Sequence, residues 1–469
     1  MTSSTTSTDK KHRIGWMGWL LMGLVWGGGL RAQSLTPAAA VLPPHPAVPV
    51  TDTVRLTLDQ AEKLFIEKNL NVLAGRYNVS AQQALVLQAR LLPNPTLYLE
   101  GNLFNPKNPR YSNGDTTFHR TFLPWHFGTR PDGSNGETNW NLQQLIVLAG
   151  KRRKQIALSK LNVEVNEYGL YDLVRNLKFQ LRSTFFTLYY LQQTLSIIDL
   201  ERDNVSRLVR VYEDQYRKGN IPQTEYVRLK SFQFSLESDH KDYYNQIADN
   251  MNNLMLLIGD KSTPYIVPVI NEFAIDHLAP TTFNYPDLID RAYEHRYDLK
   301  QAQAQFRYNQ KNYDLQRALR VPDVQAGINY DRNGNYIPGY YAANLTMALP
   351  VFNRNQGNIK SAQLLAQNAQ VLADFQAQQV EKDVWQAYVQ LQESDRVYRQ
   401  FDQGFVDQYT DLIGKITKAY EKGAINLVDF MSYYESYRQN VNQENQLRTD
   451  RINGYEYLNF VTGQTLFNY

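Results

Sequence analysis

The sequence predicts an internally duplicated, mixed membrane fold: a trimeric β-barrel of about 12 strands, four from each chain, continued by a long α-helical coiled-coil barrel. Three observations favour this fold: an export signal, short stretches of alternating polarity, and helical patterns far longer than those of compact domains. The 469-residue chain has no cysteine, which excludes disulfides, cysteine zinc sites and thiol nucleophiles. Its net charge of +3 is too small to indicate a nucleic-acid partner.

Residues 1–33 have the features of a secretory signal peptide. Basic residues at 10–13 precede an apolar run over 14–30, and small residues follow it. We expect cleavage on export; the alternative is a signal anchor that stays in the membrane. Residues 34–52 contain five prolines and are predicted to form an extended linker.

The first ordered element is a predicted helix from Thr57 to about Leu92. Thr57 is a candidate N-cap, and Gln60 stands three residues later, as in a capping box. The sequence Pro93-Asn94-Pro95 ends the helical pattern because proline restricts the residue before it and cannot continue a helix.

Two strands are predicted next, at 96–103 and 139–147, because apolar and polar residues alternate there. The segment 105–138 between them is rich in Gly, Pro, Asn and aromatic residues, so we expect an extracellular loop. His119 and His126 lie in this loop without other convergent ligands, which argues against a metal site.

A very long helix is predicted from Lys151 to Lys218. Apolar residues recur there at spacings of mostly three and four without a proline, so the helix would span about 100 Å as a coiled coil. Gly219 ends it, and a second helix is predicted over 223–257. The basic cluster 151–154 is interpreted as interfacial charge where barrel meets helices; a basic ring inside the mouth is the alternative.

The same order of elements then recurs after a proline-containing connector at 260–285. The expected elements are a helix (286–319), two strands (324–330 and 341–349, joined across Asn333-Gly334), a long helix (356–420) and a last helix (426–460). Gly219 and Gly423 are 204 residues apart, as are Gly259 and Gly463. We therefore predict a tandem duplication, with repeats at 53–262 and 263–469.

The predicted strands determine the assembly. Strands of about nine residues suit a tilted crossing of a bilayer, but four strands cannot close a barrel, and open sheet edges are not tolerated in lipid. Three chains would supply about 12 strands and a closed barrel. The long helices would then continue this barrel as a tunnel into the periplasm.

These features resemble the TolC-type outer-membrane efflux protein family over about Thr53 to Gly463. The resemblance rests on the duplicated order, the proline-bounded strands, the Gly-containing tips and the segment Glu294–Leu299. It implies an outer-membrane homotrimer in contact with lipid, with its helical barrel in the periplasm. It also implies a passive exit duct for small solutes (drugs or metal ions), served by a periplasmic adaptor (membrane fusion) protein and an inner-membrane pump.

The two tips share the pattern Tyr-x-Lys-Gly-x-Ile, at 216–221 and 420–425. In the resembled family such tips dock the adaptor. The matching residues here are Gly219, Asn220, Ile221, Thr224, Glu225, Gly423, Ala424 and Ile425. A purely structural interpretation is also open, in which both glycines are left-handed helix stops.

The resemblance also implies a pore gate at the second tip, formed by Tyr420 and Asp429. Ile425 and Ser432 occupy positions where the family has an arginine and a second acidic residue, which argues against a salt-bridged lock. Three Asp429 carboxylates around a narrow pore would favour cations. The alternative is a solvated Asp429 stabilised by the start of its helix.

The sequence contains no nucleophile elbow, no phosphate-binding loop and no His-Glu-x-x-His motif, so no enzyme activity, cofactor or metal is expected. Two other functions stay open at this point. One is a type I protein secretion duct, which would use the same trimer. The other is an exported coiled-coil scaffold without a pore.

Overall fold

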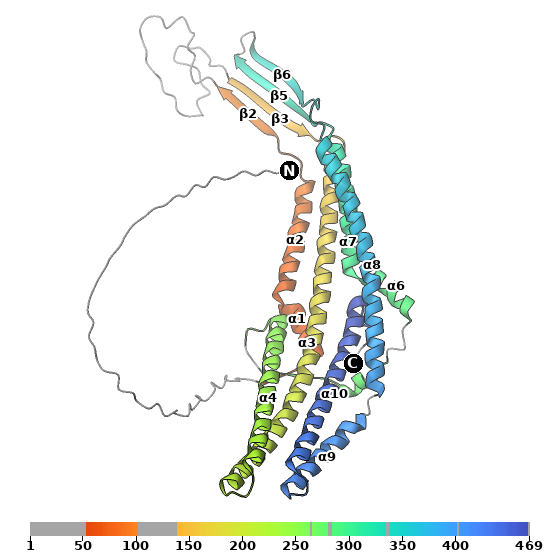
Figure 1. Ribbon diagram of the computed structural model, residues 1–469. Helices are drawn as coiled ribbons and strands as arrows, with labels where there is room; N and C mark the ends of the chain where they lie inside the picture. Colours follow the sequence, from red (N-terminus) through yellow and green to blue (C-terminus); the bar gives the residue numbers. More distant parts are fainter. Residues whose placement is uncertain are drawn as a thin grey trace, which may run out of the picture. The chain divides into compact units, whose positions relative to one another are not determined.

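The computed structural model describes residues 53–101, 138–262, 265–279, 284–333, 337–400 and 403–467. The predicted signal peptide, the linker to residue 52 and the loop before Thr138 lie outside these ranges. Within them, long helices carry a four-stranded sheet at one end, and two helical hairpins turn at the other end (Figure 1).

The described residues form ten helices and six strands. The helices are α1 (Leu58–Lys68), α2 (Leu70–Arg90), α3 (Lys151–Arg217), α4 (Gln223–Ile258), α5 (Glu272–Asp276), α6 (Tyr285–His295), α7 (Tyr297–Leu319), α8 (Gln356–Gln400), α9 (Gln403–Glu421) and α10 (Leu427–Thr462). The strands are β1 (Thr53–Thr57), β2 (Thr96–Gly101), β3 (Thr138–Ile146), β4 (Tyr265–Val269), β5 (Val324–Asn333) and β6 (Pro338–Met347).

The four-stranded sheet is antiparallel, in the order β2-β3-β5-β6, and its two faces differ sharply in polarity. Because side chains alternate along a strand, the register determines which residues share a face. One face carries the cross-strand row Leu97, Leu142, Ile328 and Ala343; the other carries Thr96, Gln143, Gly327 and Asn344. Large side chains of the apolar face are exposed to solvent, and the exposed fraction of Leu345 is 77%.

The prediction of only four strands was wrong, because β1 and β4 form a second, parallel sheet. Thr53 pairs with Tyr265, and Thr57 pairs with Val269. The connector predicted at 260–285 therefore contains β4 and the short helix α5. Local periodicity does not reveal a five-residue parallel pair, because its hydrogen bonds join segments that are far apart in the chain.

The helix predicted from Thr57 to Leu92 is two helices, because the backbone turns at Asn69. Asn69 is extended (φ −62°, ψ 122°), and its side-chain oxygen accepts hydrogen bonds from the amides of Asn71 and Val72. Its buried Nδ2 donates to the carbonyl of Leu257 at 2.9 Å. Asn69 therefore starts α2 as an N-cap. The capping box of Thr57 and Gln60 is confirmed.

One other predicted helix is also divided. The helix expected over 286–319 breaks at Arg296, which is extended between α6 and α7. The helix expected over 356–420 is described as α8, ending at Gln400, and α9, beginning at Gln403. The continuous helix α3 is confirmed, with 67 residues and a length of about 100 Å.

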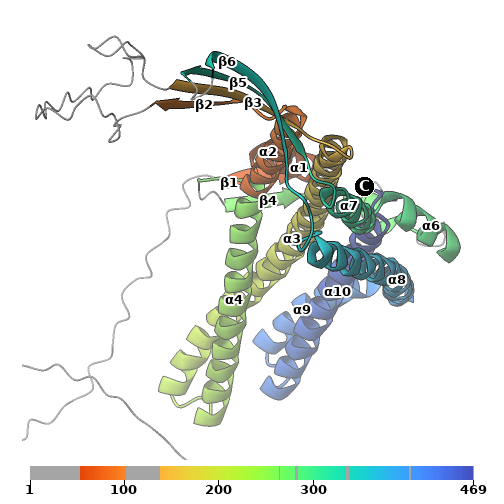
Figure 2. The same ribbon diagram turned by 90° about the horizontal axis from the view of Figure 1, so that it is seen from above.

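Helix α3 is the central element, since it contacts α2, α4, α7 and α10. Helices α2 and α7 accompany α3 near the sheet, and α4 and α10 accompany it toward the hairpins (Figures 1 and 2). Buried side chains form three separate clusters along the helices instead of one central core. No helix in the described part of the chain is long and apolar enough to cross a membrane.

Candidate functional site at the helical tips

Both tips are closed by the same backbone hydrogen bonds. At the first, the Gly219 amide donates to the Tyr216 carbonyl and the Asn220 amide to the Gln215 carbonyl, both at 2.9 Å. At the second, Gly423 and Ala424 donate in the same way to Tyr420 and Ala419, again at 2.9 Å. These are Schellman motifs, which satisfy the last carbonyls of a helix.

The two tip glycines have left-handed backbones, with φ of 75° at Gly219 and 69° at Gly423. An added Cβ would meet nothing within 4 Å at either position, so the backbone conformation and not the available space favours glycine. The interpretation of both as left-handed helix stops is confirmed.

Most of the predicted docking residues face solvent. Gly219, Asn220 and Thr224 at the first tip, and Gly423 and Ala424 at the second, are exposed. The remaining three, Ile221, Glu225 and Ile425, are half-buried. The tips thus present exposed backbone and short polar groups beside the half-buried Ile221 and Ile425.

The returning helices begin differently at the two tips. Pro222 is the N-cap of α4, with no side-chain capping bond, and Glu225 lies in the first turn. At the second tip, Asn426 caps α10: its Oδ1 accepts from the Asp429 amide at 2.9 Å, and its Nδ2 donates to Asp429 Oδ2 at 2.8 Å. Asp429 is exposed and is held at the positive end of the α10 dipole.

The two predicted gate residues differ in exposure. Asp429 is exposed, whereas Tyr420 is 4% exposed and its ring is stacked between Tyr212 of α3 and Phe430 of α10. The centroid separations are 5.5 Å and 4.3 Å. Burial raises the pKa of Tyr420, with Tyr212 adding to the effect. In this conformation Tyr420 is a packing residue between the hairpins.

The sequence did not predict the aromatic stacking near the two tips, within the hairpins and between them. Besides Tyr212 and Phe430, Tyr216 and Tyr226 stack with ring centroids 5.4 Å apart across the first tip. The sequence does contain a signal for an aromatic face, because Tyr212 and Tyr216 lie four residues apart and therefore on one side of the helix. Their partners lie on other helices, and only the tertiary structure identifies them.

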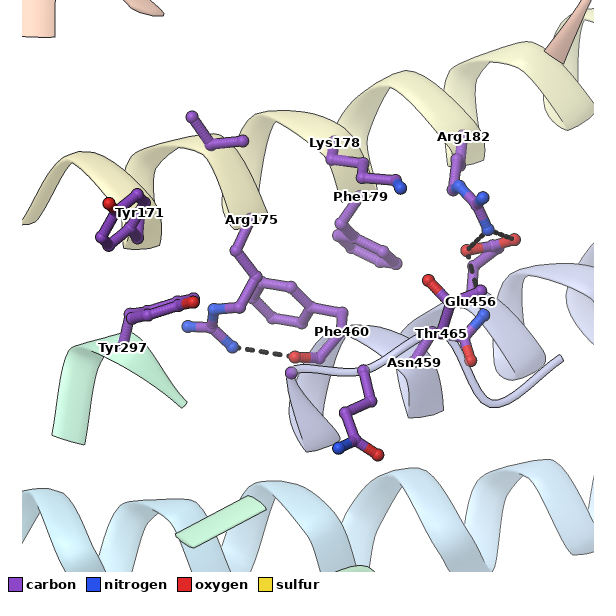
Figure 3. Close-up of a pocket in the computed structure, with 13 residues that line it drawn as sticks. Tyr171, Arg175, Lys178, Phe179, Arg182, Tyr297, Glu456, Asn459, Phe460 and Thr465 are labelled. Atoms are coloured by element: carbon purple, nitrogen blue, oxygen red, sulfur yellow. Dashed lines mark hydrogen bonds and ion pairs between the residues drawn. The ribbon is translucent and has the colours of Figure 1, made fainter. Parts of the chain in front are cut away.

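A second candidate site is a cavity of about 240 Å³ between α3, the start of α7 and the end of α10 (Figure 3). Three cations line it, and each is engaged by a carboxylate: Arg175 with Asp172 at 2.6 Å, Lys178 with Glu62 at 2.9 Å, and Arg182 with Glu456 at 2.9 Å. The cavity therefore does not present unpaired positive charge to an anion.

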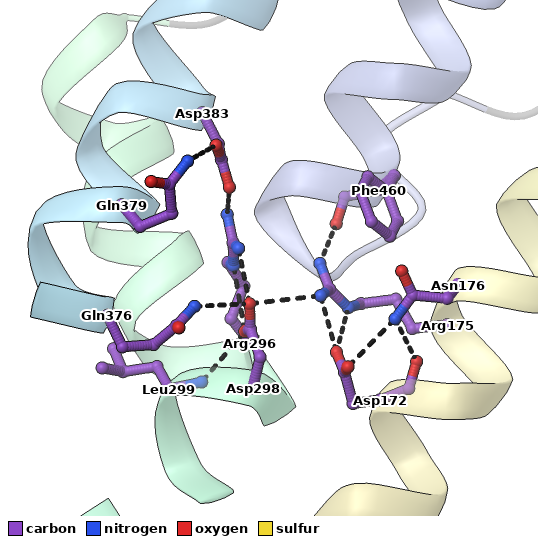
Figure 4. Close-up of polar contacts among 10 residues, drawn as sticks. All are labelled: Asp172, Arg175, Asn176, Arg296, Asp298, Leu299, Gln376, Gln379, Asp383 and Phe460. Atoms are coloured by element: carbon purple, nitrogen blue, oxygen red, sulfur yellow. Dashed lines mark hydrogen bonds and ion pairs between the residues drawn. The ribbon is translucent and has the colours of Figure 1, made fainter. Parts of the chain in front are cut away.

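Beside this cavity, an ionic network fixes the break between α6 and α7 (Figure 4). The buried Arg296 guanidinium donates to Asp298 at 2.5 Å and to Asp383 of α8 at 2.8 Å, and Arg175 of α3 lies 3.3 Å from Asp298. Burial alone would raise the pKa of Asp298, but the Arg296 hydrogen bond and charge hold it below its usual value.

The first residue of the basic cluster 151–154, which follows β3, has a structural role. Lys151 is buried, and its Nζ lies 2.7 Å from Asp323 Oδ1, which also accepts from the Leu148 amide at 2.9 Å. Arg152 donates to the carbonyl of Arg90. The interfacial interpretation therefore fits these two residues, which bind the sheet to the helices.

The described residues contain no group of three or more His, Cys, Asp or Glu side chains placed to hold a metal ion.

Comparison with known proteins gives concordant results. Residues 288–464 match the family model described as "Outer membrane efflux protein". The chain is 21% identical over 339 residues to the cobalt-zinc-cadmium resistance protein CzcC of Cupriavidus metallidurans, covering 72% of each chain. Among solved structures it is similar to CusC (16% identity, TM-score 0.65, 87% of this chain and 92% of that one) and to the outer-membrane channel CmeC of Campylobacter jejuni (14%, 0.67, 88% and 87%).

The long helices that end in exposed hairpin tips and carry a two-faced sheet thus define the fold of an outer-membrane channel protomer. More particularly, residues 288–464 match the outer membrane efflux protein family, and the chain is similar to CzcC at 21% identity. This match indicates an outer-membrane protein.

Proposed function

We propose that this chain is one protomer of a homotrimeric exit duct in the outer membrane, part of a tripartite efflux system. The observation that carries the proposal is the four-stranded sheet, which has one exposed apolar face and one polar face. Three such sheets close a 12-stranded barrel, with the apolar face toward lipid and the polar face toward a water-filled lumen. Closure also removes the open edges at β2 and β6.

The helices would continue this barrel into the periplasm as two duplicated units, 53–262 and 263–469. Matching hydrogen bonds at the two tips, and the recurring order of helices and strands, support the duplication. The exposed tips would dock a periplasmic adaptor, which connects them to an inner-membrane pump. Asp429 would line the periplasmic aperture as a gate residue, while Tyr420 would act by holding the hairpins together.

Among small solutes, we propose divalent transition-metal ions as the cargo. The support is the resemblance to a cobalt-zinc-cadmium resistance protein, together with the exposed carboxylate of Asp429 at the tip. A ring of three such carboxylates would attract cations. The duct itself would catalyse nothing and would hold no cofactor, because the pump supplies the energy.

Metal accumulation tests this function. A strain lacking the gene should retain more cobalt, zinc and cadmium than the same strain carrying it, as measured by elemental analysis of washed cells. A variant without residues 219–224 should fail to restore export while still forming trimers in the membrane, because it lacks only a docking tip. The exposed substitution Lys241→Ala, far from the tip, is the matched control and should export normally.

Two results would overturn these claims. Normal export by the tip-deleted variant would exclude docking through the first tip. Unchanged metal content together with loss of a secreted protein from the medium would favour a type I secretion duct instead.

A further inference from the structure

Glu201, in the lower part of α3, is a buried carboxylic acid without a partner. The residue is 3% exposed, and neither carboxylate oxygen has a hydrogen-bond partner among the described residues. Buried carboxylates elsewhere in this chain differ: Glu456 accepts two bonds from Arg182, and Asp395 is paired with Arg451 and Arg399. The environment of Glu201 therefore needs a separate explanation.

The charged groups facing Glu201 come from α4 and α10. They are Asp239 of α4 and Glu435 and Arg438 of α10, with Tyr434 of α10 also close enough to interact. Arg438 is the single cation in this set. It is engaged elsewhere, donating to both oxygens of Glu435 at 2.7 Å and also to Asp239.

Three carboxyl groups thus share one guanidinium, and the most buried of them receives no hydrogen bond from it. An isolated buried carboxylate is strongly disfavoured in its charged form, so the neutral acid prevails. Burial raises the pKa of Glu201 to about 8; Arg438 opposes this effect, while Asp239 and Glu435 add to it. Glu201 would therefore change charge just above neutral pH.

Because of the position of Glu201, a charge on its carboxyl group would affect the packing between the two hairpins. Glu201 precedes Val205 by one helical turn, and Val205 belongs to the buried cluster that joins α3 and α4 to α9 and α10. Glu201 lies 17 residues before Lys218, so it stands about 25 Å from the first tip along the helix. Any separation of the two hairpins that opened this contact would admit water to the carboxyl group.

We propose that Glu201 is a proton-controlled latch between the α3–α4 hairpin and the α9–α10 hairpin: the neutral acid permits the closed packing, and the ionised carboxylate favours separation of the hairpins. The charged form gains hydration only when the contact opens, so proton loss and opening are thermodynamically linked. The latch concerns this chain alone; only its use in opening a duct rests on the proposed function.

The absence of cysteine allows a direct test by spin labelling. Labels at Arg210→Cys on α3 and Lys415→Cys on α9, both exposed sites, report the separation of the hairpins. The full chain is purified in detergent, with labelled chains diluted among unlabelled ones. Electron–electron distances are then measured from pH 6 to pH 9.5.

We expect the distance distribution to shift to longer values with a midpoint near pH 8. The substitution Glu201→Gln should abolish the shift, since the amide cannot ionise. Glu213→Gln should leave the shift intact, because this carboxyl group of the same helix is partly exposed and paired with Arg217. Glu201→Leu provides a second neutral variant should the amide prevent folding, and it should also give pH-independent distances.

Thermal unfolding supplies an independent measurement. The folded-state pKa of Glu201 lies above that of the unfolded chain, so its stabilising effect is present at about pH 4–5 and is lost as the pH rises to about 8. The Tm should fall over that range in the wild type and fall less in Glu201→Gln. Distances that do not change with pH, or a shift that persists in Glu201→Gln, would overturn the latch, whether or not the protein exports metals.

Discussion

At the scale of single residues, Gly327 shows how the polar face of the sheet is packed. It lies in β5, opposite Gln143 of β3 and Asn344 of β6. A Cβ at this position would clash with the Asn344 amide oxygen and would approach Gln143 Cγ to 3.0 Å. Glycine is therefore required by the amide side chains that cross over it, not by its backbone torsion.

Gly327→Ala should destabilise the sheet by about 1–3 kcal/mol, because the neighbouring amides must move to admit the methyl group. A lower temperature for dissociation of the proposed trimer on gels would measure this effect. Gly357→Ala in α8 is the matched control, since an added Cβ there meets nothing within 4 Å. Equal behaviour of the two variants would refute the steric explanation.

At the scale of elements, Arg296 joins α6, α7 and α8, of which the sequence pattern predicted α6 and α7 as a single helix. Its guanidinium bridges Asp298, at the start of α7, and Asp383 of α8, and its own backbone forms the break after α6. The arginine is 3% exposed. Removing it would leave two partly buried carboxylates without their main partner.

Arg296→Leu should therefore lower the free energy of unfolding by about 3 kcal/mol, because breaking a buried pair leaves uncompensated charge. Denaturant titration at pH 7 would measure the loss. The control is Arg396→Leu, which removes an exposed surface pair with Glu393 and should remain near wild type.

The Arg296–Asp298 pair also predicts that the stability of the fold depends on pH in the acid range. The lowered pKa of Asp298 means that its stabilising effect is complete above its unfolded value of about 3.9 and is lost as the pH falls through the folded value. The wild type should lose stability across that acid range, and Arg296→Leu should lose less. A variant with the wild-type acid profile would show that Arg296 does not control Asp298.

At the scale of the whole molecule, the two faces of the sheet decide where each strand residue would lie in the proposed barrel. Leu345 and Thr346 are neighbours on β6 but belong to opposite faces. Arginine on a lipid-facing position costs about 2–4 kcal/mol near the bilayer centre, whereas a lumen position tolerates charge.

Leu345→Arg should therefore reduce the amount of trimer recovered from outer membranes, and Thr346→Arg should assemble normally. Quantifying heat-modifiable trimer in the membrane fraction would separate the two. Full assembly of Leu345→Arg would contradict the proposed lipid-facing role of the apolar face, and a soluble, unassembled wild type would instead indicate a scaffold without a barrel.

The sequence by itself determined the features that depend on local pattern. The alternation of apolar and polar residues located the four strands of the main sheet. Near-heptad spacing of apolar residues without a proline located α3, and Gly219 and Gly423 located the two tips. These signals are local because strand period, helix period and left-handed backbone preference are properties of neighbouring residues.

The tertiary structure decided what depends on distant partners. The breaks at Asn69 and Arg296 are held by contacts to Leu257 and Asp383, which no local window contains. The β1–β4 pair, the burial of Tyr420 and the isolation of Glu201 have the same origin. Hydrogen bonding and desolvation depend on which side chains packing brings together, so three-dimensional proximity, and not sequence order, determines them.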